Sequence, residues 1–462
     1  MASPTQDGSG VQQSVTQADV PPGPDGWPLI GNTLQVANDP LAFFERAAEY
    51  GDLVRYELGG VPFTLVLHPE YVEQLLVTDS DSVEKFQFND FSGNSNQFAS
   101  EGVLCSEGEQ WRKQRTLLQN AFTLDHIEQY GAIMTDVATV HVDSWDTNEN
   151  IALNTAFSDL TLDILTQTLF DFDMGRRSEA VTQVARAINE RSDPRNLSIF
   201  LPSWIPTPLQ RQYETAMDKF EAIVDTVIKE RRRADNLTDR DDLLSLLLSA
   251  EGTEGYQHSD EELRDQLLTF LFAGHETTSL ALTYTVLLLT QNPRVRQQLR
   301  SEWNSVLGSA NPTPHDIPQL TVTDRVLTES LRLYPPAFAV FRKATDDLEL
   351  GGYRIPEGTA ITIPQYRLHR DPRFYESPES FIPDRWTNEL ENELPEYAYF
   401  PFGGGPRHCI GMRFAMMELK LVLPILLQEI EFELLSSATP ELAPGTTLQP
   451  AEDVRAQIQR RE

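Results

Sequence analysis

The chain has 462 residues, and its 40% of apolar and 23% of charged residues are typical of a folded globular protein rather than a disordered one. Its 37 basic and 70 acidic residues give a net charge of −33, which excludes a surface suited to nucleic acid or anionic membranes. The only two cysteines, Cys105 and Cys409, exclude a disulfide framework and a cysteine-rich zinc or iron–sulfur site.

The acidic excess has a second feature, because only six of the basic residues are lysine. In dilute buffer such a surface repels itself, whereas at about 1 M salt the Debye length falls to roughly 3 Å and most of the repulsion is screened. This composition is typical of salt-accumulating halophiles, so we expect a halophilic source. No stretch approaches about 18 uninterrupted apolar residues, and we expect a cytoplasmic protein without a membrane span.

The elements expected at the start of the chain are a tail and a hairpin. Residues 1–20 are polar, lack periodicity and lack the basic-then-apolar pattern of a signal peptide, so we expect a disordered tail. Two β-rich runs in residues 53–67 surround Gly59-Gly60, which predicts a hairpin. Helical periodicity then dominates residues 69–335, and strand-like pieces return at 338–365. Because there is no repeat and no Gly/Ser linker, we expect residues 21–462 to form one domain, mainly α, with small sheets built from both ends of the chain.

A long helix is expected at residues 258–290, where apolar side chains keep helical spacing. It contains the run Ala273-Gly274-His275-Glu276-Thr277-Thr278. Glycine and hydroxyl residues are poor in a helix interior, and a hydroxyl or water that enters the hydrogen-bond ladder can open a kink. By itself, however, Gly-x-x-Thr in a helix usually indicates only helix packing.

The next helix carries Glu329 and Arg332, which the i,i+3 spacing places on one face. Taken alone, this is one of the commonest surface pairs, worth a few tenths of a kcal/mol.

The most informative segment is the loop at residues 402–411, Phe-Gly-Gly-Gly-Pro-Arg-His-Cys-Ile-Gly. Its glycines and proline predict a tight turn, after which a last apolar helix runs to about residue 428. A helix N-terminus carries partial positive charge and free N–H groups, which stabilise a thiolate at Cys409. Gly411 has no side chain to block a flat group. This setting suits the single axial ligand of a haem iron, although a buried structural cysteine after a glycine-rich turn is the commoner case.

The spacing of five residues decides between these readings, because Phe402, Gly405, Arg407, Cys409 and Gly411 fit the F-x-x-G-x-R-x-C-x-G signature. In this the sequence resembles the cytochrome P-450 superfamily of haem-thiolate monooxygenases, from residue 21 to about 445. The resemblance implies the P-450 fold, a helical prism with a long distal helix and a proximal cysteine loop, formed here by one catalytic domain. It implies haem b as cofactor, Cys409 as its iron ligand, Phe402 beside the thiolate and Arg407 on a propionate.

The long helix matches the family's oxygen-activation motif A-G-x-[DE]-T. By resemblance, Thr277 positions dioxygen and water, Glu276 relays protons, and Ala273 and Gly274 leave room above the iron. We expect a structural role for Thr278 and no catalytic part for His275.

Further positions match the family's framework and its haem clamp. Glu329, Arg332 and Arg385, the last in Pro383-Asp384-Arg385-Trp386, fit the E-x-x-R pair and its third member, although the family more often has P-E-R-F there. They would form a structural latch behind the cysteine loop. The propionates would be held by Trp111 and Arg115, one helical turn apart, and by Arg342, although Lys343 could take the place of Arg342.

The implied reaction inserts one oxygen atom of O₂ into an apolar organic substrate. The sequence shows no flavin or Rossmann fingerprint, so a separate ferredoxin- or flavodoxin-type donor would supply electrons, and Arg112 and Lys113 are candidate contacts for it. The alternatives are a peroxide-driven or rearranging haem-thiolate enzyme, whose relatives usually lack the acid–threonine pair, and a non-catalytic haem-binding protein. Phe86, Phe88, Phe91 and Phe98 are candidate pocket residues in the loop 83–105, and Phe200 and Trp204 lie in a candidate lid at 191–208. Cys105 is expected to be a loop filler.

Overall fold

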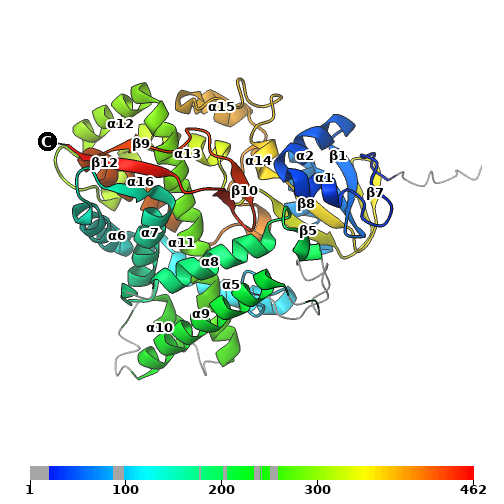
Figure 1. The fold of residues 1–462 in the computed structure, drawn as a ribbon, viewed down its shortest axis with the longest axis horizontal. Helices are drawn as coiled ribbons and strands as arrows, with labels where there is room; N and C mark the ends of the chain where they lie inside the picture. The colour runs from blue at the N-terminus through cyan, green and yellow to red at the C-terminus, as the bar shows by residue number, and fades with distance from the viewer. Residues whose placement is uncertain are drawn as a thin grey trace, which may run out of the picture.

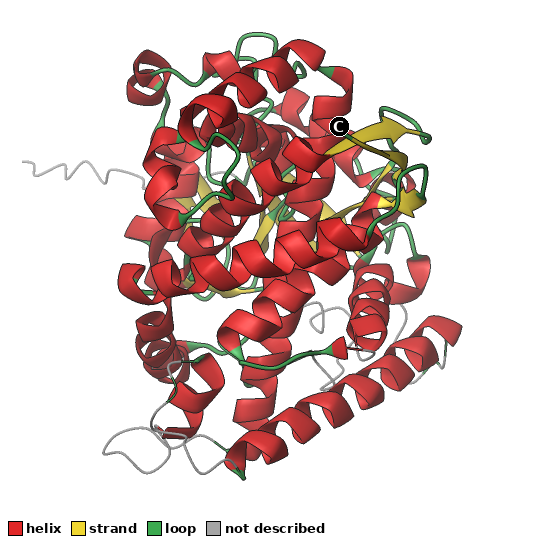
Figure 2. Cartoon of the chain, turned by 90° about the vertical axis from the view of Figure 1, so that its left-hand side faces the viewer, coloured by secondary structure: helices red, strands yellow, loops and turns green. Residues whose placement is uncertain are grey.

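The structure is a computed structural model that describes residues 20–86, 98–175, 178–200, 205, 207–233, 240, 242–249 and 259–461. Most of residues 1–20, for which a disordered tail is expected, therefore lie outside the described residues. The described part is mainly helical, with a smaller number of short strands (Figure 2). This agrees with the expected fold class.

The helices vary widely in length. The α-helices are α1 (Thr33–Asn38), α2 (Pro40–Ala47), α3 (Pro69–Glu73), α5 (Gly108–Leu118), α6 (Leu124–Ser144), α7 (Leu153–Leu169), α8 (Ser178–Ser192), α9 (Pro208–Arg232), α10 (Leu243–Ser249), α11 (Asp260–Gln291), α12 (Pro293–Val306), α13 (Thr321–Leu333), α14 (Gln365–Leu368), α15 (Asn388–Glu393) and α16 (Met412–Glu429). The short helical turns are η1 (Ala48–Tyr50), η2 (Gln74–Thr78), η3 (Ser80–Ser82), η4 (Gln119–Phe122), η6 (Leu197–Phe200), η8 (Pro314–Gln319), η9 (Pro383–Arg385), η10 (Glu396–Ala398) and η11 (Gly405–Arg407).

The largest sheet joins segments from the two ends of the helical region. Its order is β1 (Leu53–Leu58), β2 (Val61–Val66), β8 (Ala360–Ile363), β5 (Val340–Ala344) and β3 (Val83–Lys85). β1 and β2 form the antiparallel hairpin predicted around Gly59-Gly60, and β2 then pairs in parallel with β8. Figure 1 shows the blue β1 in the same sheet as the yellow β8, although about 300 residues separate them in the chain. The prediction that strands from both ends pair around the helices is confirmed.

A second sheet ties the C-terminal end of the chain to the helical body. Its order is β4 (Asn150–Ala152), β12 (Arg455–Arg460) and β9 (Ile430–Leu434), all antiparallel. Two-stranded ladders are formed by β6 (Leu348–Leu350) with β7 (Tyr353–Ile355) and by β10 (Leu442–Pro444) with β11 (Leu448–Pro450). The turn between β10 and β11 reaches the helices of the site described below.

Helix α11 is the central element of the core and confirms the predicted long helix (Figure 1). It begins with a cap, because the Ser259 side chain accepts a hydrogen bond from the backbone N–H of Glu262, and three acidic residues occupy its first turn. From Asp265 to Leu289 every residue is buried except Ala273, Gly274 and Thr277. Those three share one face, so the only accessible surface of this stretch lies at the proposed oxygen-side motif. Among the described residues, no helix is both long and apolar enough to cross a membrane.

Candidate active site

The cysteine loop is a tight turn that ends where α16 begins. The backbone N–H of Cys409 donates to the carbonyl of Phe402 at 2.9 Å, which closes the loop across its base. Gly405 has φ +63°, and a Cβ there would lie 1.7 Å from the carbonyl oxygen of Leu76, so only glycine fits. At Gly411 a Cβ would meet nothing closer than 4.0 Å, and Cys409 Sγ is one of the two atoms at that distance. The loop therefore exposes the sulfur beside open space.

Cys409 faces a large cavity while protein surrounds it on its other sides. The thiol is accessible from within the cavity, which also accounts for its high exposed fraction. Burial raises the pKa of the Cys409 thiol, whereas the N–H of Gly411 and the charge of Arg115 lower it. The expected stabilisation by the helix N-terminus is present, but burial is the larger effect. In the protein alone, the sulfur is therefore held as a neutral thiol.

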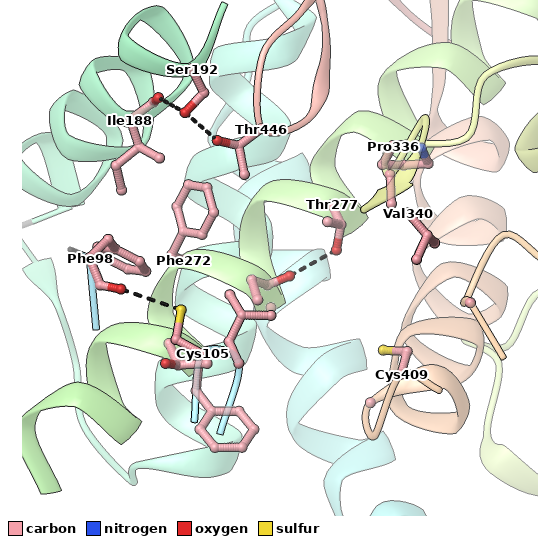
Figure 3. Close-up of a pocket in the computed structure, with 18 of the residues that line it drawn as sticks. Phe98, Cys105, Ile188, Ser192, Phe272, Thr277, Pro336, Val340, Cys409 and Thr446 are labelled. Atoms are coloured by element: carbon pink, nitrogen blue, oxygen red, sulfur yellow. Dashed lines mark hydrogen bonds between the residues drawn. The ribbon is translucent and has the colours of Figure 1, made fainter. Parts of the chain in front are cut away.

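The accessible face of α11 lines the same cavity. Figure 3 shows Thr277 and Cys409 facing the cavity from different elements, and Ala273 and Gly274 also line it. The hydroxyl of Thr277 donates to the carbonyl of Ala273 at 2.8 Å, and α11 continues through this point without the break that the sequence allows. A Cβ at Gly274 would lie 2.6 Å from Cδ1 of Leu165, so this glycine also permits the close approach of α7.

Glu276 does not line the cavity that Thr277 faces. It lines a separate polar pocket between α7, α8, α11 and the C-terminal strands. Its Oε1 accepts hydrogen bonds from Asn189 Nδ2 at 3.0 Å, from the hydroxyl of Thr447 at 3.3 Å and from Gln449. Burial raises the pKa of Glu276 to about 7, and these hydrogen bonds oppose the rise. The carboxyl is thus balanced between its two protonation states near neutral pH.

His275 is fully buried and lies outside the cavity lining. Its Nδ1 contacts the carbonyl of Leu271, its Nε2 lies 3.9 Å from Glu276 Oε2, and burial lowers its pKa to about 4. The imidazole is therefore neutral and packed in the core.

The cavity wall near the cysteine loop carries a group of cations. Trp111 and Arg115, both on α5, line it together with Arg407. The Arg407 guanidinium lies 4.4 Å from the centre of the Trp111 ring, and its Nη2 contacts Glu107 and the Ser106 carbonyl. Arg407 Nη1, however, is buried without any hydrogen-bond partner among the described residues. Such an orphaned donor indicates an anionic ligand that completes the site.

Strand β5 carries two neighbouring cations, Arg342 and Lys343, and only the first lines this cavity. Arg342 lines the cavity and is buried, whereas Lys343 pairs with Glu84 at 3.5 Å. Lys85, which the sequence analysis did not single out, lies opposite Arg342 in the β3–β5 register and also lines the cavity. Burial and neighbouring arginines lower the pKa of Lys85 to about 7 and that of Arg342 to about 10. The cations repel one another, which again favours a ligand with negative charge.

The comparison with known proteins agrees with this geometry. A sequence profile described as Cytochrome P-450 matches residues 21–455. The chain belongs to the cytochrome P-450 family.

Three bacterial relatives illustrate the similarity. The chain is 36% identical over 411 residues to the "Cyclooctatin synthase" of Streptomyces melanosporofaciens, covering 87% of each chain. It is 33% identical over 403 residues to the "Cyclooctat-9-en-7-ol 5-monooxygenase" of the same organism, covering 87% of this chain and 86% of the relative. It is 31% identical over 409 residues to the "Pentalenene oxygenase" of Streptomyces avermitilis, covering 88% and 90%. The protein is a haem-thiolate monooxygenase, an oxidoreductase that uses O₂, an organic substrate and an external redox partner.

The residues present fit a haem. One face of the cavity offers a single thiol in a loop where Gly411 leaves space, and the wall beside it offers Arg115, Arg342 and Arg407, the last with an unused buried donor. A planar group with one metal and two carboxylates matches this donor set.

The predicted cytochrome P-450 latch residues lie together in the core. Glu329 and Arg332 are fully buried and form two parallel hydrogen bonds of 2.8 Å, and Arg385 Nε reaches Glu329 Oε1 at 3.0 Å. Two contacts were not foreseen, because Trp386 Nε1 and the backbone N–H of Ile382 also donate to Glu329, each at 2.9 Å. One carboxylate thereby holds α13 and η9 together.

The latch connects to the cysteine loop through His369. Arg332 Nη1 donates to the carbonyl of His369 at 2.8 Å, and His369 Nε2 accepts from the backbone N–H of Phe400 at 3.0 Å. Burial lowers the pKa of His369 to about 3, so the ring is neutral and accepts through Nε2. Phe400 lies two residues before Phe402, the first residue of the cysteine loop, and Phe402 lines the cavity.

The remaining sequence predictions concern the roof, the lid and the electron donor. Phe86 and Phe98 line the cavity, and Phe98 packs on Phe272 with ring centres 5.3 Å apart. Cys105 also lines it, and its thiol contacts the Phe98 carbonyl at 3.5 Å. The other predicted positions, Phe88, Phe91, Trp204 and the side chain of Phe200, lie outside the described residues. Arg112 and Lys113 are exposed on α5, where they pair with Asp81 and Glu109.

Proposed function

We propose that Cys409 is the proximal ligand of haem b in a monooxygenase that inserts one oxygen atom of O₂ into an apolar organic substrate. The observation that carries this proposal is that Cys409, in the loop before α16, and Thr277, on α11, line one cavity. When bound, the haem would supply the redox chemistry that activates dioxygen, with a thiolate ligand that favours cleavage of the O–O bond.

The cysteine loop would hold the metal, and the cations would hold the propionates. Because burial keeps the Cys409 thiol neutral in the protein alone, ligation requires loss of its proton. Arg407 would donate through its unpartnered Nη1, and Arg115, Arg342 and Trp111 line the same wall. Phe402 would shield the sulfur from water. The latch of Glu329, Arg332 and Arg385 would fix the loop through His369 and Phe400.

Glu276 and Thr277 would move protons between two compartments. Glu276 would take protons from the polar pocket on the α8 side, where Asn189, Thr447 and Gln449 hold its carboxyl. Rotation about its side-chain bonds would bring the carboxyl toward the cavity, where the Thr277 hydroxyl would orient water and dioxygen. Ala273 keeps this part of the cavity wall small. A buried acid with a pKa near neutrality would be able both to take up and to release the two protons that each turnover needs.

The setting of the enzyme forms part of the proposal. Residues 21–462 would form one catalytic domain, working in a cytoplasm of high salt that screens the net charge of −33. A ferredoxin or flavodoxin would deliver electrons, and the exposed Arg112 and Lys113, which pair with Asp81 and Glu109, would be among its contacts.

A comparison of two oxidants tests the roles of Glu276 and of the electron donor. Hydrogen peroxide brings oxygen that is already reduced and protonated, so it bypasses both electron and proton delivery. In Glu276→Gln we expect turnover driven by reduced ferredoxin to fall about 100-fold or more while peroxide-driven turnover is retained. Glu261→Gln, an exposed change on the same helix, is the control. Equal loss with both oxidants would contradict the proton role, and peroxide-driven turnover alone in the wild type would favour a peroxygenase.

A further inference from the structure

The cavity has a second polar end, distant from the cysteine loop. It lies between the last turn of α8 and the start of α9, and its walls include Arg191, Ser192, Gln210, Tyr213 and Thr446. In Figure 3, Ser192 and Thr446 lie across the cavity from Cys409, with Thr277 between. Their hydroxyls are already engaged, because Thr446 donates to Ser192, which donates to the carbonyl of Ile188.

Arg191 is the one cation at this end of the cavity, and it has no carboxylate partner among the described residues. The acid nearest to it in sequence beyond the helix, Asp193, is already bound by Arg195 through Nε and Nη2 at 2.9 and 2.7 Å. Other arginines of this acidic protein are paired with carboxylates, as the buried Arg231 is with Asp242. A guanidinium that lines a cavity without a counter-ion indicates a ligand that supplies one.

Arg191 is placed against the side chain of Tyr213. Its guanidinium carbon lies 4.3 Å from the centre of the Tyr213 ring, and the two side chains also share a hydrogen bond. Because a guanidinium has five N–H donors, it can serve Tyr213 and still offer two donors to a carboxylate. Burial raises the pKa of Tyr213, although the charge of Arg191 and the hydrogen bond to it oppose the rise, so the phenol stays protonated and can donate as well.

The wall between this end and the proposed oxygen site is apolar. Ile188, Leu165, Leu169 and Phe98 line it, and Phe272 packs on Phe98. A ligand that reaches from Arg191 to Thr277 therefore needs an apolar body.

We propose that Arg191 anchors a carboxylate carried by an otherwise apolar substrate, whose far end is placed near Thr277. This inference rests on the proposed function, since it assigns the substrate class of that same cavity. The reaction would then fall on a carbon remote from the carboxylate. A C–H bond breaks, a C–O–H group forms with one oxygen atom of O₂, and the other atom leaves as water with two protons and two electrons from the external donor.

A carboxylate fits this end better than a more highly charged anion. One guanidinium and one phenol match a single negative charge, and the next cation along the chain, Arg195, is committed to Asp193 and Glu441. Position in the last turn of α8 is itself favourable for a cation, so a purely helix-stabilising role for Arg191 is the competing explanation.

Calorimetric titration of the holoenzyme at molar salt tests the proposal. The probes are two matched pairs, decanoate with decanol and adamantane carboxylate with adamantane methanol, which separate a flexible chain from a compact ring. We expect at least one acid to bind more tightly than its alcohol. In Arg191→Gln that acid should bind about 10- to 100-fold more weakly, with the alcohol unchanged. Arg191→Lys, which keeps the charge but not the planar fork, should give an intermediate loss.

The control is Arg186→Gln, which removes the same charge from the exposed side of α8 and should change neither affinity. The proposal is overturned if neither acid is preferred over its alcohol, or if Arg191→Gln weakens acid and alcohol equally. The reduced-CO spectrum is recorded on the same samples. A protein that lacks the haem-thiolate band but still prefers the acid would count against the role of Cys409. The proposal for Arg191 would then still be tested by the affinities.

Discussion

Glu276 Oε1 accepts a hydrogen bond from Asn189 Nδ2 at 3.0 Å, and this contact ties α11 to α8 at the point where α11 carries the oxygen-side motif. It also fixes the direction of the carboxyl, which lies in the polar pocket rather than in the cavity that Thr277 lines. The carboxyl of Glu276 and the hydroxyl of Thr277 therefore lie in different spaces, the polar pocket and the cavity.

The buried Glu276 makes the stability of the fold depend on pH. Its pKa is about 7 in the folded protein and 4.5 when exposed, so between these values the folded state binds more protons than the unfolded state. Its contribution is fully favourable below about pH 4.5 and is lost as the pH rises through about 7. Glu276→Gln should remove this loss and leave the variant more stable than the wild type above pH 7, by up to about 3 kcal/mol.

Denaturant unfolding of the haem-loaded protein at several pH values measures the effect. The free energy of unfolding of the wild type should fall more steeply from acidic to alkaline pH than that of Glu276→Gln. Parallel curves for the two proteins would show that Glu276 ionises with its ordinary pKa.

The neighbours Arg342 and Lys343 give a matched test of the haem clamp. Arg342→Met removes a buried cation that other cations repel, so the protein without haem should be no less stable than the wild type. Because the variant lacks a donor for a propionate, it should bind haem about 10- to 100-fold more weakly. Lys343→Met removes the same charge from a side chain that pairs with Glu84, and should leave haem affinity unchanged. Haem transfer to apomyoglobin measures the release. If both variants release haem alike, Arg342 holds no propionate.

Much of the site could be predicted because it is carried by short motifs. The spacing around Cys409 depends on a turn that only glycine can make at Gly405, and the pair Glu329 and Arg332 follows from helical geometry. Strand periodicity also implies that Arg342 and Lys343 face opposite sides, although it does not say which side is the cavity. The hairpin at Gly59-Gly60 is likewise a local feature.

Other features depend on contacts between distant segments. Adjacent residues on a helix point about 100° apart, so Glu276 and Thr277 can face different spaces, but the partners that hold Glu276 come from α8 and the C-terminal strands and are not visible in the local sequence. Lys85 enters the clamp only because β3 pairs with β5. Arg191 reads as a helix-end cation in the sequence, and only the packing of α8 beside α9 places it in the cavity.

The latch should be worth far more than a surface ion pair. Glu329→Ala leaves Arg332 and Arg385 without their buried counter-charge, and we expect a loss of about 3–5 kcal/mol in the free energy of unfolding. Haem retention should fall with it, since the latch reaches the cysteine loop through His369. Lys113→Ala, which breaks an exposed pair on α5, should change neither quantity measurably. A Glu329→Ala protein as stable as the wild type would contradict the framework role.

The most direct test of the account compares the two cysteines by the reduced-CO difference spectrum. The wild type should show the red-shifted band from which the family takes its name, because that band requires a thiolate on the iron. Cys105→Ser, which changes a thiol in the same cavity, should keep the band, and Cys409→Ser should lose it while still binding haem between the same cations. A Cys409→Ser protein that keeps the band, or a wild type that never shows it, would contradict the assignment of Cys409 as the iron ligand.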